Sequence, residues 1–579
     1  MLASLAVYIG PLLIVLLPVV YLVVKRVQDK RMRRLLIAKW GKAEALRRPD
    51  SDLSHDIATY WKAAQAAQPQ LGAVDDTTWN DLEMDLLLRG IDCSRSIVGS
   101  EVLYAVLREQ GADGETLAGR DALADAFLRD EALRLRVEMT LSNIGYRAFH
   151  GAWRYLYSAD YQMPDKPWRF RVLAVLPTLL ALLGFVYEPF FIAAILALAL
   201  NTFVNYRTQA IWEKELVALR HISMVLHAAG KLSKIEDAAL AVHTAELREL
   251  LSALRPIRFW LSLFGSEPVH EWDVLTPYLK IMFMLDMLSF TAIVQGLSRH
   301  GEQVSRLYRL VGEMDAVLSI AQLKARSPKL CTPQFTQDLA VQAEGVRHPL
   351  VRDAVVNDLH WQRHLLITGS NASGKSTFIK AMAINCVLAQ TLHLCFARRF
   401  SMCRAQLLTS MAIRDQLLAG ESYFIAEIRS MKRIADAAAG GQRALCFVDE
   451  ILRGTNTIER IAASSSLLRS FVGTDVLCMA ATHDIELTRI LADVYDNAHF
   501  SETVTEAGVT FDYLLRHGPT STRNAILLLA QMGFAPDIVA LARQQVAHFE
   551  QTGLWETGDA PSDQPRLRNP GGTGRIEQE

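Results

Sequence analysis

A glycine-rich loop constrains the fold of this chain more than any other stretch of its sequence. The loop reads Gly369-Ser-Asn-Ala-Ser-Gly-Lys-Ser-Thr377, follows the apolar run Leu365 to Ile367 and precedes a helical pattern from Phe378 to about Leu388. Glycines let successive backbone N–H groups point at one centre, and the helix that follows directs its positive end at the same anion. A strand, this loop and a helix in that order predict an α/β domain with a phosphate-binding loop.

The loop supplies candidate ligands for a nucleoside triphosphate. Lys375 has the reach to contact the β- and γ-phosphates, and the hydroxyl of Ser376 is placed to ligate Mg²⁺. The predicted nucleotide-binding residues of the loop are Gly369, Ser370, Asn371, Ala372, Ser373, Gly374, Lys375, Ser376 and Thr377.

An acidic pair provides the second half of a hydrolytic site. The apolar run Leu445 to Val448 predicts a buried strand that ends in Asp449-Glu450. We expect Asp449 to hold Mg²⁺ through water or Ser376, and Glu450 to act as the general base or to position the attacking water. Such pairs are common at strand ends, but here the pair follows a phosphate loop, and that order indicates ATP or GTP hydrolysis.

A histidine follows the next predicted strand. Val476 to Ala481 ends in Thr482-His483, and a histidine at this position can contact the γ-phosphate and sense its hydrolysis, although a lone histidine is more often structural. The predicted catalytic residues are therefore Lys375, Glu450 and His483, and the predicted metal ligands are Ser376 and Asp449.

Length and composition limit the remaining classes of function. A chain of 579 residues suggests about three or four domains. Its 61 basic and 62 acidic residues give no global electrostatic attraction to nucleic acid, so any such binding depends on a local patch. Seven cysteines without a C-x-x-C pair argue against a disulfide framework or a zinc site and fit a reducing compartment.

The N-terminus predicts a membrane anchor. Leu2 to Val24 carries no charge and is long enough to cross a hydrocarbon core of about 30 Å. A cleavable signal peptide is the rival interpretation, but no basic residue precedes the run. A basic cluster follows it and predicts a cytoplasmic location for the rest of the chain, as in a bacterial inner-membrane protein. The cluster, which could instead bind nucleic acid, consists of Lys25, Arg26, Lys30, Arg31, Arg33 and Arg34.

A second apolar block, Val172 to Val204, carries the single charge of Glu188 and predicts a hairpin of two short membrane helices that turns at Tyr187 to Pro189. Each arm is close to the lower limit of about 17 residues for spanning a bilayer, so a re-entrant hairpin or a buried helical pair are alternatives. A third stretch, Ile281 to Leu297, contains Asp286 and is interpreted as a buried core helix.

The order of these features divides the chain into six regions. A seam of apolar residues from Val304 to Ala321, in steps of three and four, predicts a long packed helix in the fourth of them. The regions are a transmembrane anchor (1–27), a helical region (28–165), a transmembrane hairpin (166–206), a helical core or lever domain (207–330), the nucleotide domain (331–550) and a disordered tail (551–579).

Four motifs, in this order along the chain, resemble the ATPase domain of the MutS family. They are Thr368 to Thr377, Gly420 to Glu427, Asp449 to Thr457 and Ala481 to His483. The resemblance covers roughly residues 335–551. Glu344 to Pro349 is similar to the lead-in of that domain, and the stretches 75–109 and 310–334 are similar to the start and the end of the helical core of the family. The resemblance therefore brackets the hairpin.

The resemblance implies an Mg²⁺-dependent ATPase that works as a homodimer. It places Ser422 at the γ-phosphate of the opposite subunit, Tyr513 against adenine and His483 as a switch. Residues 521–549 would form a helix-turn-helix that locks the dimer.

The chain also departs from the family. Leu452 stands where glycine is usual, and Arg523-Asn524-Ala525 replaces a small-aromatic-glycine run. The mismatch-reading domain has no counterpart. We therefore expect an α/β P-loop ATPase domain of the ABC type, joined to an all-α core with an N-terminal transmembrane helix and an internal transmembrane hairpin.

The expected function is that of a membrane-anchored MutS-like ATPase without mismatch recognition, acting on an unidentified protein partner. The alternative is a membrane-tethered DNA-binding repair or recombination ATPase that uses basic residues such as Arg26, Arg31, Arg33 and Arg34. A transporter ATPase is disfavoured, since no transporter signature motif is evident.

Overall fold

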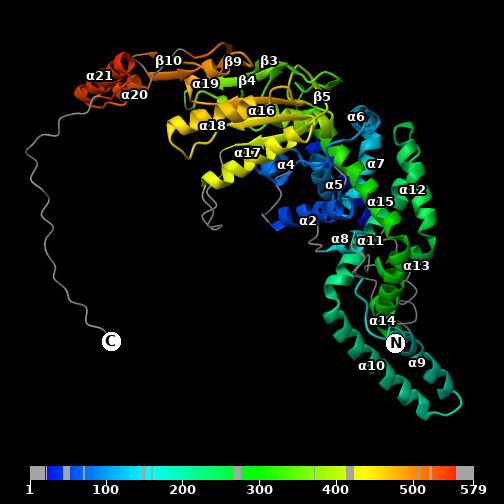
Figure 1. Cartoon of the computed structure of the whole chain (residues 1–579). Helices are drawn as coiled ribbons and strands as arrows, with labels where there is room; N and C mark the ends of the chain where they lie inside the picture. Colours follow the sequence, from blue (N-terminus) through cyan, green and yellow to red (C-terminus); the bar gives the residue numbers. More distant parts are fainter. Residues whose placement is uncertain are drawn as a thin grey trace, which may run out of the picture.

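The computed structural model describes residues 20, 23–42, 52–69, 72–146, 151–157, 161–265, 275–327, 329–370, 372–411, 423–505, 508–520 and 525–555. An α/β domain lies at the top of Figure 1, and a long helical domain extends from it and ends in a projecting hairpin. Most of the expected anchor, Asn371, Ser422 and residues 556–579 lie outside the described parts of the chain.

The α/β domain is built on a six-stranded sheet with the order β12-β9-β4-β8-β7-β6. Its strands are β4 (His364–Thr368), β6 (Gln406–Ser410), β7 (Ala444–Asp449), β8 (Val476–Ala481), β9 (Tyr495–His499) and β12 (Arg516–His517). All neighbours are parallel except β12, which is antiparallel to β9. Every residue of β7 and β8 is buried, as expected for parallel strands covered on both faces.

Two layers of helices cover this sheet. Helix α16 (Lys375–Leu392) shares one apolar cluster with alternate residues of β4, β7 and β8. The opposite face shares a second cluster with α17 (Tyr423–Ala439), α18 (Thr457–Arg469) and α19 (Ile485–Ile490). The predicted α/β class is therefore confirmed, and α16 extends beyond the expected end near Leu388.

Smaller elements complete the domain. A four-stranded sheet has the order β1-β5-β2-β3, and β10 pairs with β11. These elements and the C-terminal helices are β1 (Gln334–Thr336), β2 (Val341–Val346), β3 (Asn357–Trp361), β5 (Arg399–Cys403), β10 (Glu502–Thr505), β11 (Gly508–Phe511), α20 (Ala525–Gln531) and α21 (Pro536–Thr552). The expected start of the disordered tail at 551 is wrong, because α21 continues to Thr552 and Trp555 stacks on Phe549 with ring centroids 4.4 Å apart.

The helical domain packs around α15 (Leu285–Arg326), a helix of 42 residues with a kink at His300. The predicted seam is confirmed, because the side chains from Val304 to Ala321 that form it are buried. The surrounding elements are a helix over residues 23–39, α2 (Asp52–Ala67), α3 (Asp76–Asp81), α4 (Met84–Ile91), α5 (Ile97–Arg108), α6 (Gly114–Arg129), α7 (Glu131–Ser142), α8 (Ala152–Tyr157), α11 (Glu213–Leu232), η2 (Ala238–Leu240), α12 (Ala241–Ala253), α13 (Arg255–Gly265) and α14 (Leu275–Met282).

The two stretches that bracket the hairpin in the sequence meet at Asp315. Its buried carboxylate accepts hydrogen bonds from the backbone N–H of Arg95 (2.7 Å) and from the N–H and hydroxyl of Ser96 (2.8 and 2.6 Å). Gly99 lies so close that a Cβ there would stand 2.4 Å from this carboxylate. Burial raises the pKa of Asp315 to about 6. Helices α5 and α15 thus belong to one core interrupted in sequence by the hairpin.

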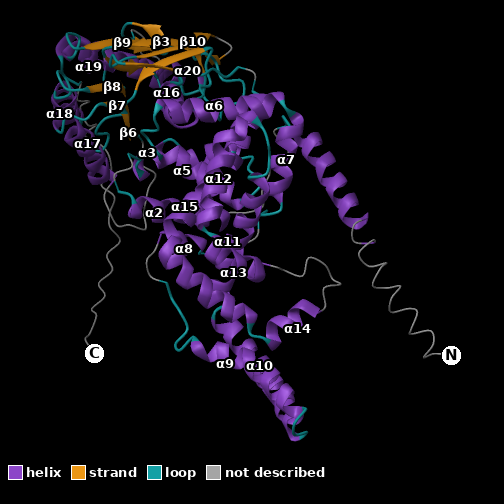
Figure 2. Ribbon diagram, turned by 90° about the vertical axis from the view of Figure 1, so that its right-hand side faces the viewer, coloured by secondary structure: helices purple, strands orange, loops and turns teal. Residues whose placement is uncertain are grey.

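The hairpin consists of α9 (Trp168–Gly184) and α10 (Pro189–Ile211) and projects from the body in both views (Figures 1 and 2). It turns where the sequence predicted a turn. Among the described residues, α10 is the one helix long and apolar enough to cross a membrane.

The third apolar stretch is not the single helix that the sequence predicted. Met284 has a φ of +50° and separates α14 from α15. From Leu285 onward the stretch is a buried core helix, as expected. Asp286 lies 3.8 Å from the ammonium of Lys280 and accepts a hydrogen bond from Gln209 at 3.1 Å, so its carboxylate is compensated inside the protein.

Candidate active site

Strand pairing brings the expected site residues to one edge of the sheet. Ile367 of β4 and Asp449 of β7 both stand opposite Ala481 of β8. Two further hydrogen bonds fix the segments that follow: Thr482 N–H donates to Ile367, and Glu450 N–H donates to Ala481. The phosphate loop, the acidic pair and the predicted histidine therefore leave the sheet side by side, as parallel strands require.

The loop after β4 needs glycine at its first position. Gly369 has a φ of +147°, and a Cβ there would approach the carbonyl oxygen of Phe500 to 2.7 Å and the hydroxyl of Ser373 to 2.9 Å. Gly374 has a φ of +108° and is the N-cap of α16. Only glycine meets both demands without strain, so the backbone N–H groups remain open to an anion.

Lys375 lies folded over the loop. Its side chain is nearly buried, and its ammonium donates to the carbonyls of Gly369 (2.7 Å) and Ser370 (2.8 Å). Burial lowers the pKa of Lys375, while Asp449 and Glu450 act in the opposite direction. The Lys375 ammonium therefore contacts the same loop that would bind a phosphate group.

Ser376 and Asp449 form a hydrogen-bonded pair suited to a divalent cation. Burial raises the pKa of Asp449, and the hydrogen bond with Ser376 opposes that rise. Among the described residues, the buried Oδ1 of Asp449 has no hydrogen-bond partner. A buried carboxylate oxygen beside a hydroxyl is the donor set that Mg²⁺ prefers, so these residues fit the expected metal.

Glu450 is held by two side chains. His483 Nε2 lies 3.0 Å from its Oε1, and Arg453 forms an ion pair with its Oε2. His483 Nε2 is also 3.4 Å from the Lys375 ammonium. One ring nitrogen cannot both donate to Glu450 and accept from Lys375, and we assign the shorter contact as the hydrogen bond. That bond, followed by Arg453, lowers the pKa of Glu450.

The turn after Glu450 keeps the backbone that glycine favours, although glycine is absent. Glu450 and Leu452 have φ values of +56° and +54°. Glu427 of α17 supports the turn, because its carboxylate accepts from the backbone N–H of Arg453 at 3.1 and 3.2 Å. Burial raises the pKa of Glu427. Leu452 thus adopts a left-handed backbone conformation although it is not glycine. That conformation costs about 1–2 kcal/mol for a residue with a Cβ.

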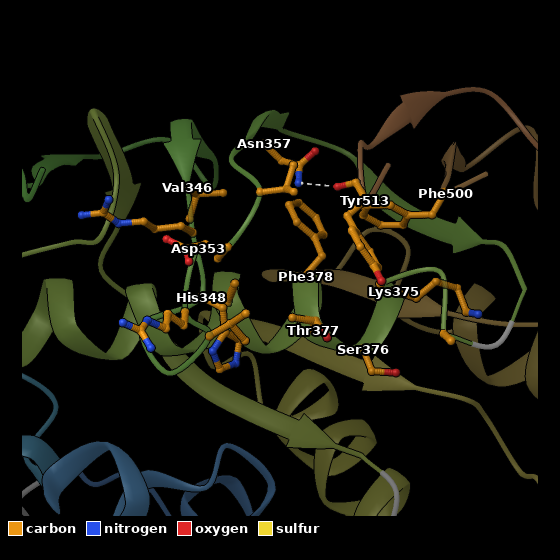
Figure 3. A pocket seen from close by; sticks show the side chains of 18 of the residues that line it. Val346, His348, Asp353, Asn357, Lys375, Ser376, Thr377, Phe378, Phe500 and Tyr513 are labelled. Carbon is orange, nitrogen blue, oxygen red and sulfur yellow. Dashed lines mark hydrogen bonds between the residues drawn. The ribbon is translucent and has the colours of Figure 1, made fainter. Parts of the chain in front are cut away.

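A cavity of about 620 Å³ adjoins the loop and is large enough for a nucleotide. Tyr513 lines it, and its ring would lie 3.1 Å from a Cβ at Gly374. Asn357 fixes this position by donating to the Tyr513 carbonyl at 3.0 Å, and Figure 3 shows Tyr513 close to Phe500 and Phe378. The opposite wall includes His348, whose pKa burial lowers to about 4.

Several of these residues were not identified as site residues from the sequence. Glu427 lies in the motif from Gly420 to Glu427, and Arg453 lies in the motif from Asp449 to Thr457, but the sequence pattern alone predicts no function for either side chain. His348 lies in the recognised lead-in from Glu344 to Pro349, which was the available signal. Glu502, which accepts a hydrogen bond from Ser370 at 2.8 Å, gave no signal, since it lies 132 residues away. Asn371 and Ser422 lie outside the described residues.

This arrangement defines a P-loop domain of the nucleoside-triphosphate hydrolase class. Residues 365–550 match the family MutS domain V, and residues 324–394 match the FtsK/SpoIIIE family. The chain is also similar to the DNA mismatch repair protein MutS of Thermus caldophilus, with 27% identity over 259 residues. That match covers 44% of this chain and 31% of the relative. The α/β domain is therefore the ATPase domain of a MutS-family protein.

The ion pair between Arg453 and Glu450 leads to a prediction about pH. Glu450 could serve as the expected base only when it is ionised, and Arg453 helps to lower its pKa. We expect Arg453→Gln to raise that pKa, so that the acid limb of kcat/KM for nucleotide hydrolysis moves to higher pH. The matched control is Arg469→Gln, which removes a surface pair with Asp493. An acid limb that stays in place in Arg453→Gln would contradict the role of this ion pair.

Proposed function

We propose that the protein is a membrane-anchored, dimeric ATPase that hydrolyses ATP with Mg²⁺ and does not recognise mismatched DNA. The observation that carries the proposal is the meeting of Lys375, Asp449 and Glu450 at one sheet edge, where a buried oxygen of Asp449 has no partner among the described residues.

Each group has a distinct task in this proposal. The N–H groups of the loop and Lys375 bind the phosphates, and Tyr513 faces the base in the adjoining cavity. Ser376 and Asp449 hold Mg²⁺, which supplies neutralisation of the charge that develops on the phosphate oxygens. Glu450 orients the attacking water and accepts its proton, and its hydrogen bond to His483 positions the carboxylate.

Membrane attachment is supported by the apolar exterior of the hairpin and by the basic residues at its base.

DNA binding is the second candidate, and two observations favour it. One is the similarity to the Thermus relative, which is named a DNA mismatch repair protein. The other is the helix over residues 23–39, on which Arg26, Arg31 and Arg34 are exposed. Binding to phosphates through such residues weakens steeply as salt rises. ATPase rates measured with and without duplex DNA at several salt concentrations separate the two candidate functions. Only a DNA-binding ATPase should be stimulated by DNA in a way that weakens as salt rises.

Two substitutions separate phosphate binding from the chemical step. We expect Lys375→Ala to weaken both nucleotide binding and turnover, because the ammonium contacts the phosphates. Glu450→Gln is expected to bind ATP normally and to turn over at least about 10²-fold more slowly, because an amide cannot accept the proton. Binding and steady-state hydrolysis are measured on the same preparations. An unchanged rate in Glu450→Gln would exclude its assignment.

We further propose that two subunits share each ATP site. The family motif assigns Ser422 to the γ-phosphate of the opposite subunit, so a closed two-fold dimer has two sites that each combine Lys375 of one chain with Ser422 of the other.

Co-expression of two inactive variants tests this sharing. A heterodimer of Lys375→Ala and Ser422→Ala chains concentrates both lesions in one site and leaves the other intact. We expect such mixtures to recover part of the wild-type ATPase rate, measured on heterodimers purified through two different tags. No recovery would mean that Ser422 acts within its own chain or has no role.

A further inference from the structure

The hairpin has an apolar exterior and an interior of small residues. Large apolar side chains of both arms point outward, and their exposed members are Val172, Val175, Leu179, Leu182, Ile192, Ile195, Leu196, Leu200 and Phe203. The arms meet through Ala174, Pro177, Ala194 and Ala197, which are buried. Small residues between helices and large apolar residues outside are the pattern of helices surrounded by lipid.

Asn201 fixes the register of the two arms. Its side-chain amide donates to the carbonyl of Leu173 on α9 and to that of Met282 on α14, both at 2.8 Å. Leu173 and Asn201 therefore lie at the same height along the hairpin. Trp168 precedes Leu173 by five residues and Tyr206 follows Asn201 by five, so both aromatic residues lie about 7 Å closer to the base.

Trp168 and Tyr206 are exposed at this common height, and exposed basic residues lie next to them in the sequence. We call this group the collar; its basic members are Lys166, Arg169, Arg171 and Arg207. Tryptophan and tyrosine prefer the headgroup level of a bilayer, and lysine and arginine attract anionic headgroups. The collar therefore marks where the hairpin would meet an anionic membrane surface.

The hairpin is too short to reach from the collar to the opposite surface. Helix α9 begins at the collar and has 17 residues, which gives a length of about 25 Å. The hydrocarbon core of a bilayer is about 30 Å thick, and the bilayer measures about 40–45 Å when both headgroup regions are included.

The turn at the tip is also apolar and outward-facing. Phe185 is 81% exposed and Val186 is 85% exposed. Glu188 is the only charged residue between Arg171 and Arg207, and it is the N-cap of α10, where unpaired backbone N–H groups stabilise a carboxylate.

We propose that the hairpin is a re-entrant wedge that enters an anionic bilayer from the side of the ATPase domain and ends inside it. This inference rests on the proposed membrane attachment and adds its depth and topology. The wedge places the collar at the headgroups and Val186 in the hydrocarbon.

The depth of the tip tests the wedge. The full chain carries a polarity-sensitive fluorophore on Val186→Cys, and Cys331, the one natural cysteine that is not fully buried, is replaced by serine. The protein is added to preformed vesicles of phosphatidylcholine and phosphatidylglycerol. We expect a loss of fluorescence with quenchers attached deep in the acyl chains and none with aqueous quenchers, outside or trapped in the lumen. Tyr206→Cys should respond to shallow quenchers, and the exposed α12 position Val242→Cys to the outer aqueous quencher.

Each other result overturns the wedge in a different way. Quenching of the Val186 label from the lumen would mean that the hairpin spans the bilayer, which preserves membrane attachment but excludes the wedge. Quenching from outside would mean that the hairpin is not in lipid, and membrane attachment through it would fail as well. A label that is shielded before vesicles are added, in a chain that sediments as an oligomer, would assign the apolar surface to a second copy of the protein.

Discussion

Burial of β4, β7 and β8 on both faces is the constraint on which the site depends. Strands this apolar must lie in the centre of a parallel sheet, and parallel strands end at one edge. The groups that follow them, Lys375, Asp449 and His483, are thereby brought together without a dedicated scaffold. The positions of the site residues therefore follow from the points at which the three buried strands end.

Helix packing connects this edge to the hairpin. Helix α16, which starts at the phosphate loop, packs on α5 and α6, and these pack on α15. Helix α15 has 42 residues and reaches from Asp286 at the base of the hairpin to Lys324, which pairs with Asp121 and Asp125 of α6 beside the ATPase domain. Its residues would extend about 60 Å in a straight helix. The kink at His300 divides α15 into two segments, which together run from the base of the hairpin to the ATPase domain. Packed helices therefore connect α16 to α15.

Local sequence patterns predicted the parts that depend on local order. The phosphate loop, the strand ends at Asp449 and Ala481 and the buried seam of α15 all have a periodicity or a motif. Contacts between distant residues have neither a periodicity nor a motif. The sequence therefore does not predict the hydrogen bonds from Ser370 to Glu502 and from Asn201 to Met282. Arg453 is near Glu450 in sequence, but their ion pair requires the left-handed turn at Leu452, where the sequence has no glycine to indicate it. The sequence likewise has no glycine at Met284, whose left-handed backbone separates α14 from α15, so it does not predict this break in the helix.

We propose that the edge formed by β4, β7 and β8 is an Mg²⁺-dependent ATPase site with Ser376 and Asp449 as ligands. The most direct measurement is the ATP hydrolysis rate of the purified full chain as Mg²⁺ is titrated, for the wild type and for Asp449→Asn. We expect no turnover when Mg²⁺ is chelated, and a half-saturating Mg²⁺ concentration about 10–100-fold higher in Asp449→Asn. Hydrolysis that persists without a divalent cation, or an unchanged Mg²⁺ dependence in the variant, would contradict it.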